Sequence, residues 1–275
     1  MSNTGFDIDA YCRRIGFTGA RVPTLETLCA IHLLHPRAIP FENLDVVLRR
    51  GVRLDADSLQ RKMVQGGRGG YCFEHNMLLS LALKALGFRV TELTGRVRYG
   101  VPDGVATPLT HMLLKVDVDG VPYIVDVGFG GNTLTAPLRL DDTAEQATPH
   151  EPFRLTPAGG RILAEAKLRD VWTLLYSFTL EPQHWPDIEL GNWYMSTHPK
   201  SRFYDDLAAA RVTAEGRLAL QDNQLTIHRL NGASERRVLQ TESELRDVLT
   251  GLFGLTLPDD LGLGAALTKT LVGAV

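Results

Sequence analysis

Hydrophobic residues recur three and four positions apart through the first third of the chain, which is the spacing of one face of a helix. Capping and breaking residues set the ends. Thr24 caps a helix that closes before Pro36, and Gly87 stops a helix that begins at Cys72. The helices expected on these grounds lie at about 8–16, 25–35, 57–65 and 72–86. Together they predict a helical unit over residues 1–87.

The pattern changes after Phe88 to short runs that are rich in β-branched and aromatic residues. Strands are expected at 90–99, 111–118, 121–127, 153–155 and 172–178 and, beyond a connector over 181–199, at 211–213, 225–227 and 237–239, with a turn at 231–232. The first group predicts an antiparallel sheet or β-barrel over residues 88–190. The second group precedes a capping box at 241–244 that opens a helix, which predicts a small α+β lid within residues 191–275. The expected fold class is α+β.

Composition limits the classes of partner and compartment. The chain has 275 residues with 44% hydrophobic content, and its net charge of −3 gives no broad basic field, which argues against nucleic acid or an anionic membrane as the main partner. No run approaches the roughly 20 apolar residues of a membrane span, and residues 1–6 lack a basic-then-apolar signal. Three cysteines without metal-type spacing argue against a disulfide framework and a metal site, so we expect a cytoplasmic protein.

The candidate chemistry starts at the glycine-rich stretch Arg68-Gly69-Gly70-Tyr71-Cys72, which leads into a helix. Cys72 is expected in the first turn of that helix, where unpaired backbone N–H groups and the positive end of the helix dipole favour a thiolate. The same N–H groups suit an oxyanion that forms when a carbonyl is attacked. His75 is close in sequence but points away from Cys72, so it is not the preferred base.

A β-hairpin centred on Asp119-Gly120 supplies a better base. A turn there pairs residues whose numbers sum to 239, since 119 and 120 are its centre, and this register places His111 opposite Gly128. His111 and Asp126 are then diagonal neighbours on one face, within reach of a hydrogen bond between imidazole and carboxylate. With Cys72 they predict a Cys-His-Asp triad, in which His111 takes the thiol proton and Asp126 orients His111.

Other polar residues have simpler interpretations. From composition alone, Glu42 in its apolar segment is a solvated loop charge. His32 and His35 are best explained as histidines packed in a helix interface, because neither has a carboxylate or second ligand at i+4 spacing. The glycine-rich segment 128–132 is too short and misplaced for a phosphate-binding loop, so it is interpreted as the turn that ends the strand of Asp126.

Four segments, in this order and at this spacing, resemble the arylamine N-acetyltransferases. They are Ile39-Pro40-Phe41-Glu42-Asn43-Leu44, the stretch from Arg68 to Glu74, the His111 strand and Asp126-Val127-Gly128-Phe129-Gly130. The resemblance extends from about Ile8 to Arg211. It implies a cysteine-protease-like core of helical bundle, β-barrel and α/β lid, acetyl-coenzyme A as donor without a metal, and transfer through an acetyl-Cys72 to an arylamine, arylhydrazine or arylhydroxylamine.

The resemblance also implies roles for residues around the triad. The residues implied for the acceptor pocket are Phe41, Phe129 and Phe203, and those implied to lie along the pantetheine arm of the donor are Gly128, Gly130 and Gly131. A bidentate pair between Glu42 and Arg68 is expected to fix the glycine-rich turn, which is a structural role beside the nucleophile.

Other functions remain open on the sequence. The same triad serves cysteine hydrolases and amide synthases, which share the acyl-cysteine and differ in their donor and acceptor pockets. A scaffold without turnover is disfavoured because Cys72, His111 and Asp126 are all present. A homo-oligomer is left open by these residues.

Overall fold

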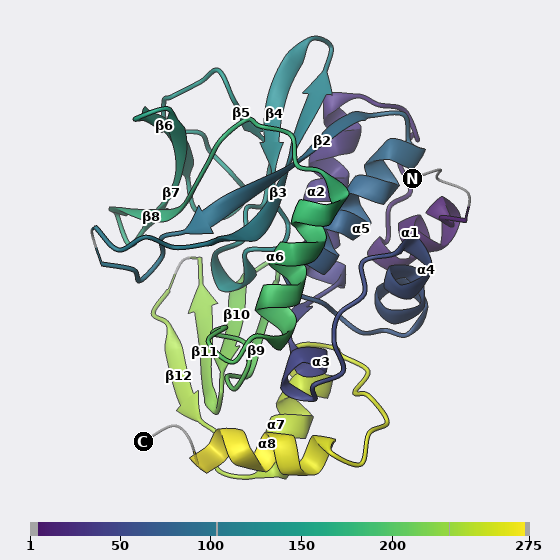
Figure 1. The fold of residues 1–275 in the computed structure, drawn as a ribbon, viewed down its shortest axis with the longest axis vertical. Coiled ribbons are helices and arrows are strands. Elements are labelled where there is room, and N and C mark those ends of the chain that lie inside the picture. Colours follow the sequence, from purple (N-terminus) through teal and green to yellow (C-terminus); the bar gives the residue numbers. More distant parts are fainter. Residues whose placement is uncertain (1–4, 103, 231, 273–275) are drawn as a thin grey trace.

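Two antiparallel sheets and the helices packed around them form the described part of the chain (Figure 1). The computed structural model describes residues 5–102, 104–230 and 232–272. Its helices are α1 Ile8–Ile15, α2 Leu25–Ala38, α3 Leu44–Val47, α4 Ala56–Leu59, α5 Cys72–Ala85, α6 Trp185–Thr197, α7 Glu242–Asp247 and α8 Leu263–Val272, with π-helical turns η1 Gln60–Gln65 and η3 Val248–Leu252 and the 3-10 turn η2 Gly130–Asn132. Its strands are β1 Phe41–Glu42, β2 Arg89–Val97, β3 Leu109–Val118, β4 Val121–Val125, β5 Leu138–Arg139, β6 Phe153–Ala158, β7 Arg161–Leu168, β8 Val171–Phe178, β9 Ala208–Val212, β10 Gly216–Gln221, β11 Gln224–Arg229 and β12 Glu235–Val238. The predicted α+β fold class is confirmed.

The N-terminal helices begin at the predicted caps, but one ends later than predicted. Asp7 caps α1 by accepting a hydrogen bond from the Ala10 N–H, and Thr24 caps α2 in the same way. The prediction that the second helix closes before Pro36 is wrong, because α2 continues to Ala38. A proline inside a helix removes one backbone hydrogen bond. Here Pro36 is buried in the helix interface, and this packing offsets the loss.

The larger sheet curls towards a barrel. Its seven strands follow the order β5-β4-β3-β2-β8-β7-β6. The edge strands approach each other, because the segment after β5 bridges to β6 through backbone hydrogen bonds between Gln146 and Phe153. The β3–β4 hairpin has the predicted register, with Leu114 opposite Val125. Strand β7 was not predicted and completes the pairing between β6 and β8.

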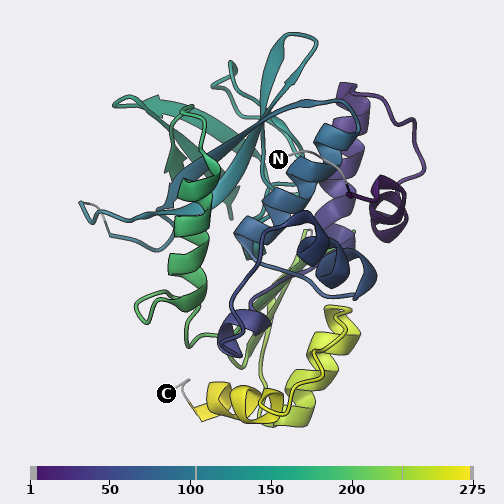
Figure 2. The same ribbon diagram turned by 45° about the vertical axis from the view of Figure 1, so that its right-hand side comes forward.

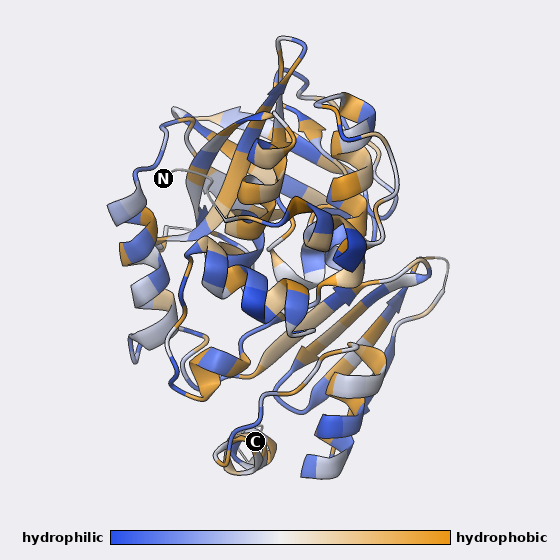
Figure 3. Ribbon diagram, turned by 90° about the vertical axis from the view of Figure 1, so that its right-hand side faces the viewer, coloured by the Kyte–Doolittle hydropathy of each residue, from blue (hydrophilic) through white to orange (hydrophobic). Residues whose placement is uncertain are grey.

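The smaller sheet joins the start of the chain to its end. Its order is β1-β9-β10-β11-β12, so the two residues of β1 pair with a strand from the C-terminal third. Leucines of β10 and β11 pack against α7, η3 and α8 in one apolar cluster. Figure 3 shows hydrophobic and hydrophilic residues mixed along these strands, as a sheet with one covered face requires. The predicted turn at 231–232 includes Asn231, which lies outside the described residues.

The predicted connector over 181–199 contains a helix, α6, of 13 residues. Pro186 lies in its first turn, where the fixed φ of proline favours helix initiation. The sequence pattern missed α6 because its apolar residues do not gather on one face: Leu190 and Trp193 are exposed while Ile188 is buried. The predicted boundary between residues 190 and 191 falls within α6, and the division into 1–87, 88–190 and 191–275 stays a prediction.

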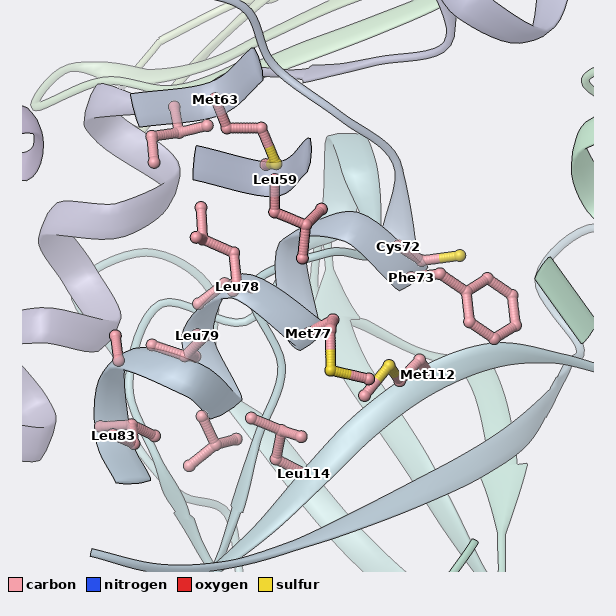
Figure 4. Packing of buried hydrophobic residues seen from close by; sticks show 14 of the residues in the cluster. Leu59, Met63, Cys72, Phe73, Met77, Leu78, Leu79, Leu83, Met112 and Leu114 are labelled. Atoms are coloured by element: carbon pink, nitrogen blue, oxygen red, sulfur yellow. The ribbon is translucent and has the colours of Figure 1, made fainter. Parts of the chain in front are cut away.

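Helix α5 is buried on nearly every side, and this fixes the position of its first residue. Eleven of its 14 residues are buried. Figure 4 shows Met77 of α5 and Met112 of β3 pointing towards each other in this cluster, while the sulfur of Cys72, at its edge, points away from Met77 on the side of Phe73. Close-packed surroundings of this kind allow little movement of the backbone. The helix therefore acts as a rigid support for Cys72.

Membrane spans and metal centres were searched within the ranges given above. In those ranges no helix combines the length and the apolar character needed to cross a bilayer. The same residues include no group of three or more His, Cys, Asp or Glu side chains arranged to hold a metal ion.

Candidate active site

Cys72 is the first residue of α5, as the glycine-rich approach predicts. Its side chain is 4% exposed, and its sulfur lies 3.7 Å from the backbone oxygen of Thr110 in β3. Two glycines pack closely against this turn. A Cβ on Gly128 would lie 2.9 Å from the Cα of Cys72, and one on Gly70 would lie 2.8 Å from the Cβ of Glu74. Both positions therefore need glycine because the chain segments approach so closely.

His111 and Asp126 lie together, as the hairpin register predicts. Nε2 of His111 donates a hydrogen bond of 2.7 Å to Oδ2 of Asp126, and both side chains are buried. His111 lies on β3 opposite Gly95 of β2, and Asp126 follows directly after β4. Because the carboxylate accepts from Nε2, the other ring nitrogen, Nδ1, is left for the nucleophile.

The imidazole of His111 lies beside the side chain of Cys72, whose charge and hydrogen bond act on its pKa. Burial by itself lowers the pKa of His111, but the charge and hydrogen bond of Asp126, followed by the hydrogen bond and charge of Cys72, raise it to about 10. Burial acts to raise the pKa of Asp126, yet His111 and the hydrogen bonds from Asn76 and Gly128 hold it below its usual value. At neutral pH a protonated imidazole therefore lies between an ionised carboxylate and the sulfur.

Asn76 is a site residue that the sequence analysis misses. Its Nδ2 donates to the backbone oxygen of Met112 at 2.7 Å and to Oδ1 of Asp126 at 3.0 Å. Its Oδ1 accepts from the Val127 N–H at 3.1 Å. One amide thus joins the helix of the nucleophile to the strand of the base and to the carboxylate. The available signal was the spacing from Cys72, since residues four apart share a helix face.

The three phenylalanines predicted for an acceptor pocket lie on two sides of the triad. Phe129 packs edge-on against His111, with ring centroids 5.1 Å apart. Phe41 and Phe203 pack against each other at 5.8 Å, and Phe203 is edge-on to Tyr71 at 6.0 Å. Phe129 therefore contacts the base itself, Phe203 lies beside the residue that precedes the nucleophile, and Phe41 lies parallel to the ring of His75 in α5.

The glycines predicted to lie along the donor differ in their surroundings. Gly128 is buried against α5, with no room for a side chain. Gly130 and Gly131, in η2, are half-buried and lie nearest Phe41 and Ala219. Only these two leave part of their backbone accessible, and Gly130 has a φ of 75°, in the left-handed region that favours glycine.

The predicted pair of Glu42 and Arg68 is present, but it is not bidentate. Nε and Nη2 of Arg68 both reach Oε1 of Glu42, at 2.9 and 2.8 Å. The second oxygen, Oε2, accepts from the Leu44 N–H at 2.6 Å, because the backbone after β1 turns back onto the carboxylate. Glu42 is fully buried, so its interpretation as a solvated loop charge is wrong. Nη2 of Arg68 also bonds Asp45 at 3.1 Å.

A second ion pair supports the same turn. Glu74, in the first turn of α5, accepts from the Tyr71 N–H at 3.0 Å and from Nζ of Lys62 at 2.7 Å. Burial raises the pKa of Glu74 to about 7, against the opposing effect of Lys62. Lys62 also pairs with Asp45 at 2.7 Å. Asp45 thereby links the two pairs into one network on the N-terminal side of the nucleophile.

Most of the chain matches one protein family. Residues 24–261 match the family model described as N-acetyltransferase. The chain is 45% identical to the arylamine N-acetyltransferase of Mycolicibacterium smegmatis, over 93% of its own length and 94% of that protein. The chain belongs to the arylamine N-acetyltransferase family.

Further members of the arylamine N-acetyltransferase family agree with this assignment. The chain is 40% identical to the arylamine N-acetyltransferase / N-hydroxyarylamine O-acetyltransferase of Salmonella typhimurium, over 92% of this chain and 90% of that one. The solved Mycobacterium marinum arylamine N-acetyltransferase in complex with CoA matches with a TM-score of 0.92 at 40% identity, covering 96% of this chain and 99% of that one. The resemblance found in the sequence is confirmed, and the chain is an acyltransferase.

A relay of buried side chains lies behind the site in this member of the arylamine N-acetyltransferase family. Nε2 of His75 donates to the backbone oxygen of Pro40 at 3.1 Å, so its Nδ1 is free to accept. That atom accepts from Nε2 of His35 at 2.9 Å, and Nδ1 of His35 accepts from the Tyr11 hydroxyl at 2.8 Å. Both histidine rings make these hydrogen bonds in their neutral form. The packing interpretation of His35 is confirmed, and these rings hold the helices around the nucleophile.

Acid is expected to destabilise the fold because three buried histidines are neutral in it. Burial lowers the pKa of His32 and of His75 to about 4 and that of His35 well below its usual value of 6.5. As pH falls from about 6.5 towards 4, the unfolded chain binds protons that the folded chain does not, so the free energy of unfolding falls. Glu74 opposes this between its usual pKa of 4.5 and its raised pKa of about 7. On unfolding near pH 5.5 the chain takes up about two protons net, so the free energy of unfolding falls by roughly 2–3 kcal/mol for each pH unit of acidification.

Urea unfolding at steps between pH 6.5 and 5 measures this slope. His35→Gln keeps one donor and one acceptor for the relay and is expected to reduce the slope by up to one proton, about 1.4 kcal/mol per pH unit. His184→Gln changes an exposed histidine in the same way and should leave the slope unaltered. Equal slopes in the wild type and His35→Gln would contradict the assignment of acid sensitivity to the relay.

Proposed function

We propose that this chain transfers an acetyl group from acetyl-coenzyme A to an arylamine, arylhydrazine or arylhydroxylamine, in two steps through an acetyl-Cys72 intermediate. The observation that carries the proposal is where the chain brings Cys72: its sulfur, at the start of α5, lies 3.7 Å from the backbone oxygen of Thr110, the residue before His111, and Nε2 of His111 donates to Asp126. The names of the relatives support an arylamine acceptor, and the CoA complex of the Mycobacterium marinum relative supports a coenzyme A thioester as donor.

In the first step the Cys72 thiolate attacks the carbonyl carbon of the thioester, and His111 holds the proton that came from the thiol. The carbonyl oxygen becomes an oxyanion, which backbone N–H groups of the first turn of α5 stabilise. When the bond from carbon to the sulfur of coenzyme A breaks, His111 gives its proton to the departing thiolate. Acylation also removes the Cys72 charge, which is one cause of the raised pKa of His111, so the proton leaves more readily.

In the second step an amine attacks the acetyl group on Cys72. The now neutral His111 takes a proton from the amine nitrogen, and Asp126 stabilises the resulting imidazolium. Breaking of the bond between carbon and sulfur releases the amide and regenerates the thiolate beside the protonated ring. Exchange of an acyl group between two sulfurs is nearly isoenergetic, so the first step is reversible. The amide formed in the second step drives the reaction forward.

Residues around the triad receive supporting roles in this proposal. The aromatic rings of Phe41, Phe129 and Phe203 line the site for an aromatic acceptor, and the accessible backbone of Gly130 and Gly131 adjoins the pantetheine arm. Gly128 acts instead by letting its loop rest on α5. Arg68 and Glu42 hold the turn before the nucleophile.

Intact-protein mass spectrometry after mixing with acetyl-coenzyme A tests the proposal. We expect the protein to gain one acetyl group, mapped to Cys72, that persists until an arylhydrazine is added. Cys29→Ser removes an exposed thiol and should still be acetylated, whereas Cys72→Ser should not. Loss of the acetyl group to water at the same rate without an acceptor would favour a cysteine hydrolase. Failure of the wild type to be acetylated would favour an amide synthase with a different donor.

Cellular context rests on the sequence alone. We retain the cytoplasm as the proposed location because the three cysteines form no disulfide among the described residues. The proposed partners are small aromatic acceptors rather than nucleic acid. The division into residues 1–87, 88–190 and 191–275 and a homo-oligomer are also kept as proposals that rest on the sequence.

A further inference from the structure

A surface cavity lies on the N-terminal side of the nucleophile, and its lining does not include the triad. It is a shallow, open hollow of about 370 Å³ between α3 and the residues after it, α4, η1 and Gly66. These elements belong to the dark blue part of the ribbon in Figure 2. The charged residues of its lining are four cations and one carboxylate, namely Arg50, Arg61, Lys62, Arg68 and Asp45.

The cations face this cavity, and two of their four carboxylate partners among the described residues, Glu42 and Glu74, lie behind them. The side chains of Arg68 and Lys62 are 10% and 15% exposed, whereas those of Glu42 and Glu74 are 0% and 3% exposed. The one carboxylate in the lining, Asp45, is already paired, with Lys62 at 2.7 Å and with Arg68 at 3.1 Å. Arg50 is paired with Asp260 at 2.7 Å, so Arg61 is the one lining cation without a carboxylate partner among the described residues, and it supplies the unbalanced positive charge of the cavity.

The guanidinium groups of Arg68 and Arg61 have N–H donors left over that a ligand could use. Arg68 uses Nε and Nη2 for its carboxylates, and its Nη1, which is open to solvent, has no hydrogen-bond partner among the residues that the structure describes. Arg61, on the rim, bonds only the Ser58 hydroxyl, at 3.2 Å, within the same part of the chain. Planar guanidinium groups match oxyanions that present several oxygens at once.

We propose that this cavity binds a tetrahedral oxyanion of the phosphate class, held by Arg61 and Arg68 with Lys62 beside them. Arg68 and Lys62 also hold Glu42 and Glu74, whose other oxygens accept backbone N–H groups on either side of the glycine-rich turn. Glu42, Glu74 and Asp45 are the three carboxylates that Arg68 and Lys62 already hold, and a bound anion is a fourth negatively charged partner. It stabilises the segment that leads into the nucleophile. The inference is independent of the proposed acetyl transfer.

Thermal unfolding in increasing sodium phosphate, with ionic strength held constant by sodium chloride, tests the site. The wild type is expected to show a saturable rise in its unfolding midpoint, roughly 3 °C when phosphate is ten times its dissociation constant. Arg61→Gln, at an exposed position, should keep the midpoint of phosphate-free buffer and bind phosphate about tenfold more weakly. Arg53→Gln removes an exposed arginine that pairs with Asp55 outside the cavity, and it should keep the full rise.

A second titration with adenosine 3′,5′-bisphosphate distinguishes two sources of the phosphate group. Action at a tenfold lower concentration than inorganic phosphate assigns the site to a nucleotide, and equal potency assigns it to free phosphate. Either result supports the site when Arg61→Gln weakens it. An unsaturable dependence, or the same rise in Arg61→Gln as in Arg53→Gln, overturns the proposal. Because the readout is stability, the result does not depend on whether acetyl transfer occurs.

Discussion

Cys72→Ser is expected to lower kcat/KM for acetyl transfer to an arylhydrazine by about 10⁴-fold or more. The two side chains are similar in volume, but a hydroxyl holds its proton far more tightly than a thiol. The His111 imidazolium, which still pairs with Asp126, therefore has no thiolate beside it at neutral pH, and the attacking group stays protonated. Any acetyl-serine that did form is an ester, which reacts with amines more slowly than a thioester. Steady-state kinetics measures the combined loss.

The matched control is Cys29→Ser, which makes the same change of atom at an exposed cysteine and should keep wild-type kinetics. The unfolding midpoint of Cys72→Ser should stay near that of the wild type, because the hydroxyl is no larger than the thiol and has the backbone oxygen of Thr110 beside it as an acceptor. A Cys72→Ser protein within tenfold of wild-type activity would place the nucleophile elsewhere.

The sequence predicted the site where local chain geometry determines it. Asp119 and Gly120 have φ values of 49° and 81°, as a two-residue hairpin turn requires. That turn fixes the register of β3 and β4, and the register brings His111 to Asp126. The start of α5 at Cys72 likewise has a local signal, the glycines before it and the capping box of Tyr71 and Glu74. Both features have signals in neighbouring residues, so a pattern along the chain is sufficient to predict them.

Contacts between distant segments could not be predicted from the pattern of residues along the chain. The triad was predicted from the chemistry of Cys72 and the hairpin, but spacing along the chain does not itself bring Cys72 to His111, and the bridging role of Asn76 depends on residues 36 and 50 positions away. The burial of Glu42 likewise depends on Arg68, 26 residues later. A residue's own neighbours carry no sign of a partner supplied by tertiary packing, so local chemistry alone described Glu42 as a surface charge.

Missed elements have a compositional cause. Strand β7 contains Ala164, Glu165, Ala166 and Lys167, which are residue types depleted in strands. It forms because β6 and β8 pair with it on both sides, and its two alanines are buried. Pairing with neighbouring strands has overridden local preference here. The pattern is therefore reliable for strongly periodic segments and fails where small residues fill a covered sheet.

Asp126→Asn is expected to lower kcat/KM by roughly 10³- to 10⁴-fold with the fold retained. The reason is the set of three hydrogen bonds that the carboxylate accepts. Oδ1 accepts from Nδ2 of Asn76 at 3.0 Å and from the Gly128 N–H at 2.9 Å. Oδ2 accepts from Nε2 of His111 at 2.7 Å. An asparagine can satisfy the first two donors only with its oxygen in the Oδ1 position, so its NH₂ group must face the imidazole.

That NH₂ group can donate only to an unprotonated Nε2, so the proton of the neutral imidazole moves to Nδ1. Nδ1 is the nitrogen that has to take the proton from Cys72. The variant also loses the carboxylate charge, the largest of the effects that raise the pKa of His111 against its burial, so that pKa falls. Alkylation of Cys72 by iodoacetamide near pH 7 is therefore expected to slow together with acetyl transfer.

Asp117→Asn is the matched control, because Asp117 lies on β3 and pairs with Lys115 at 2.7 Å away from the triad. Both of its rates should stay near those of the wild type. A tautomer change has to slow alkylation as well as acetyl transfer, since both need the Cys72 thiolate. If Asp126→Asn slowed acetyl transfer alone, the carboxylate would act by holding the loop around Gly128 in place, and orientation of the base would have to come from the packing around His111.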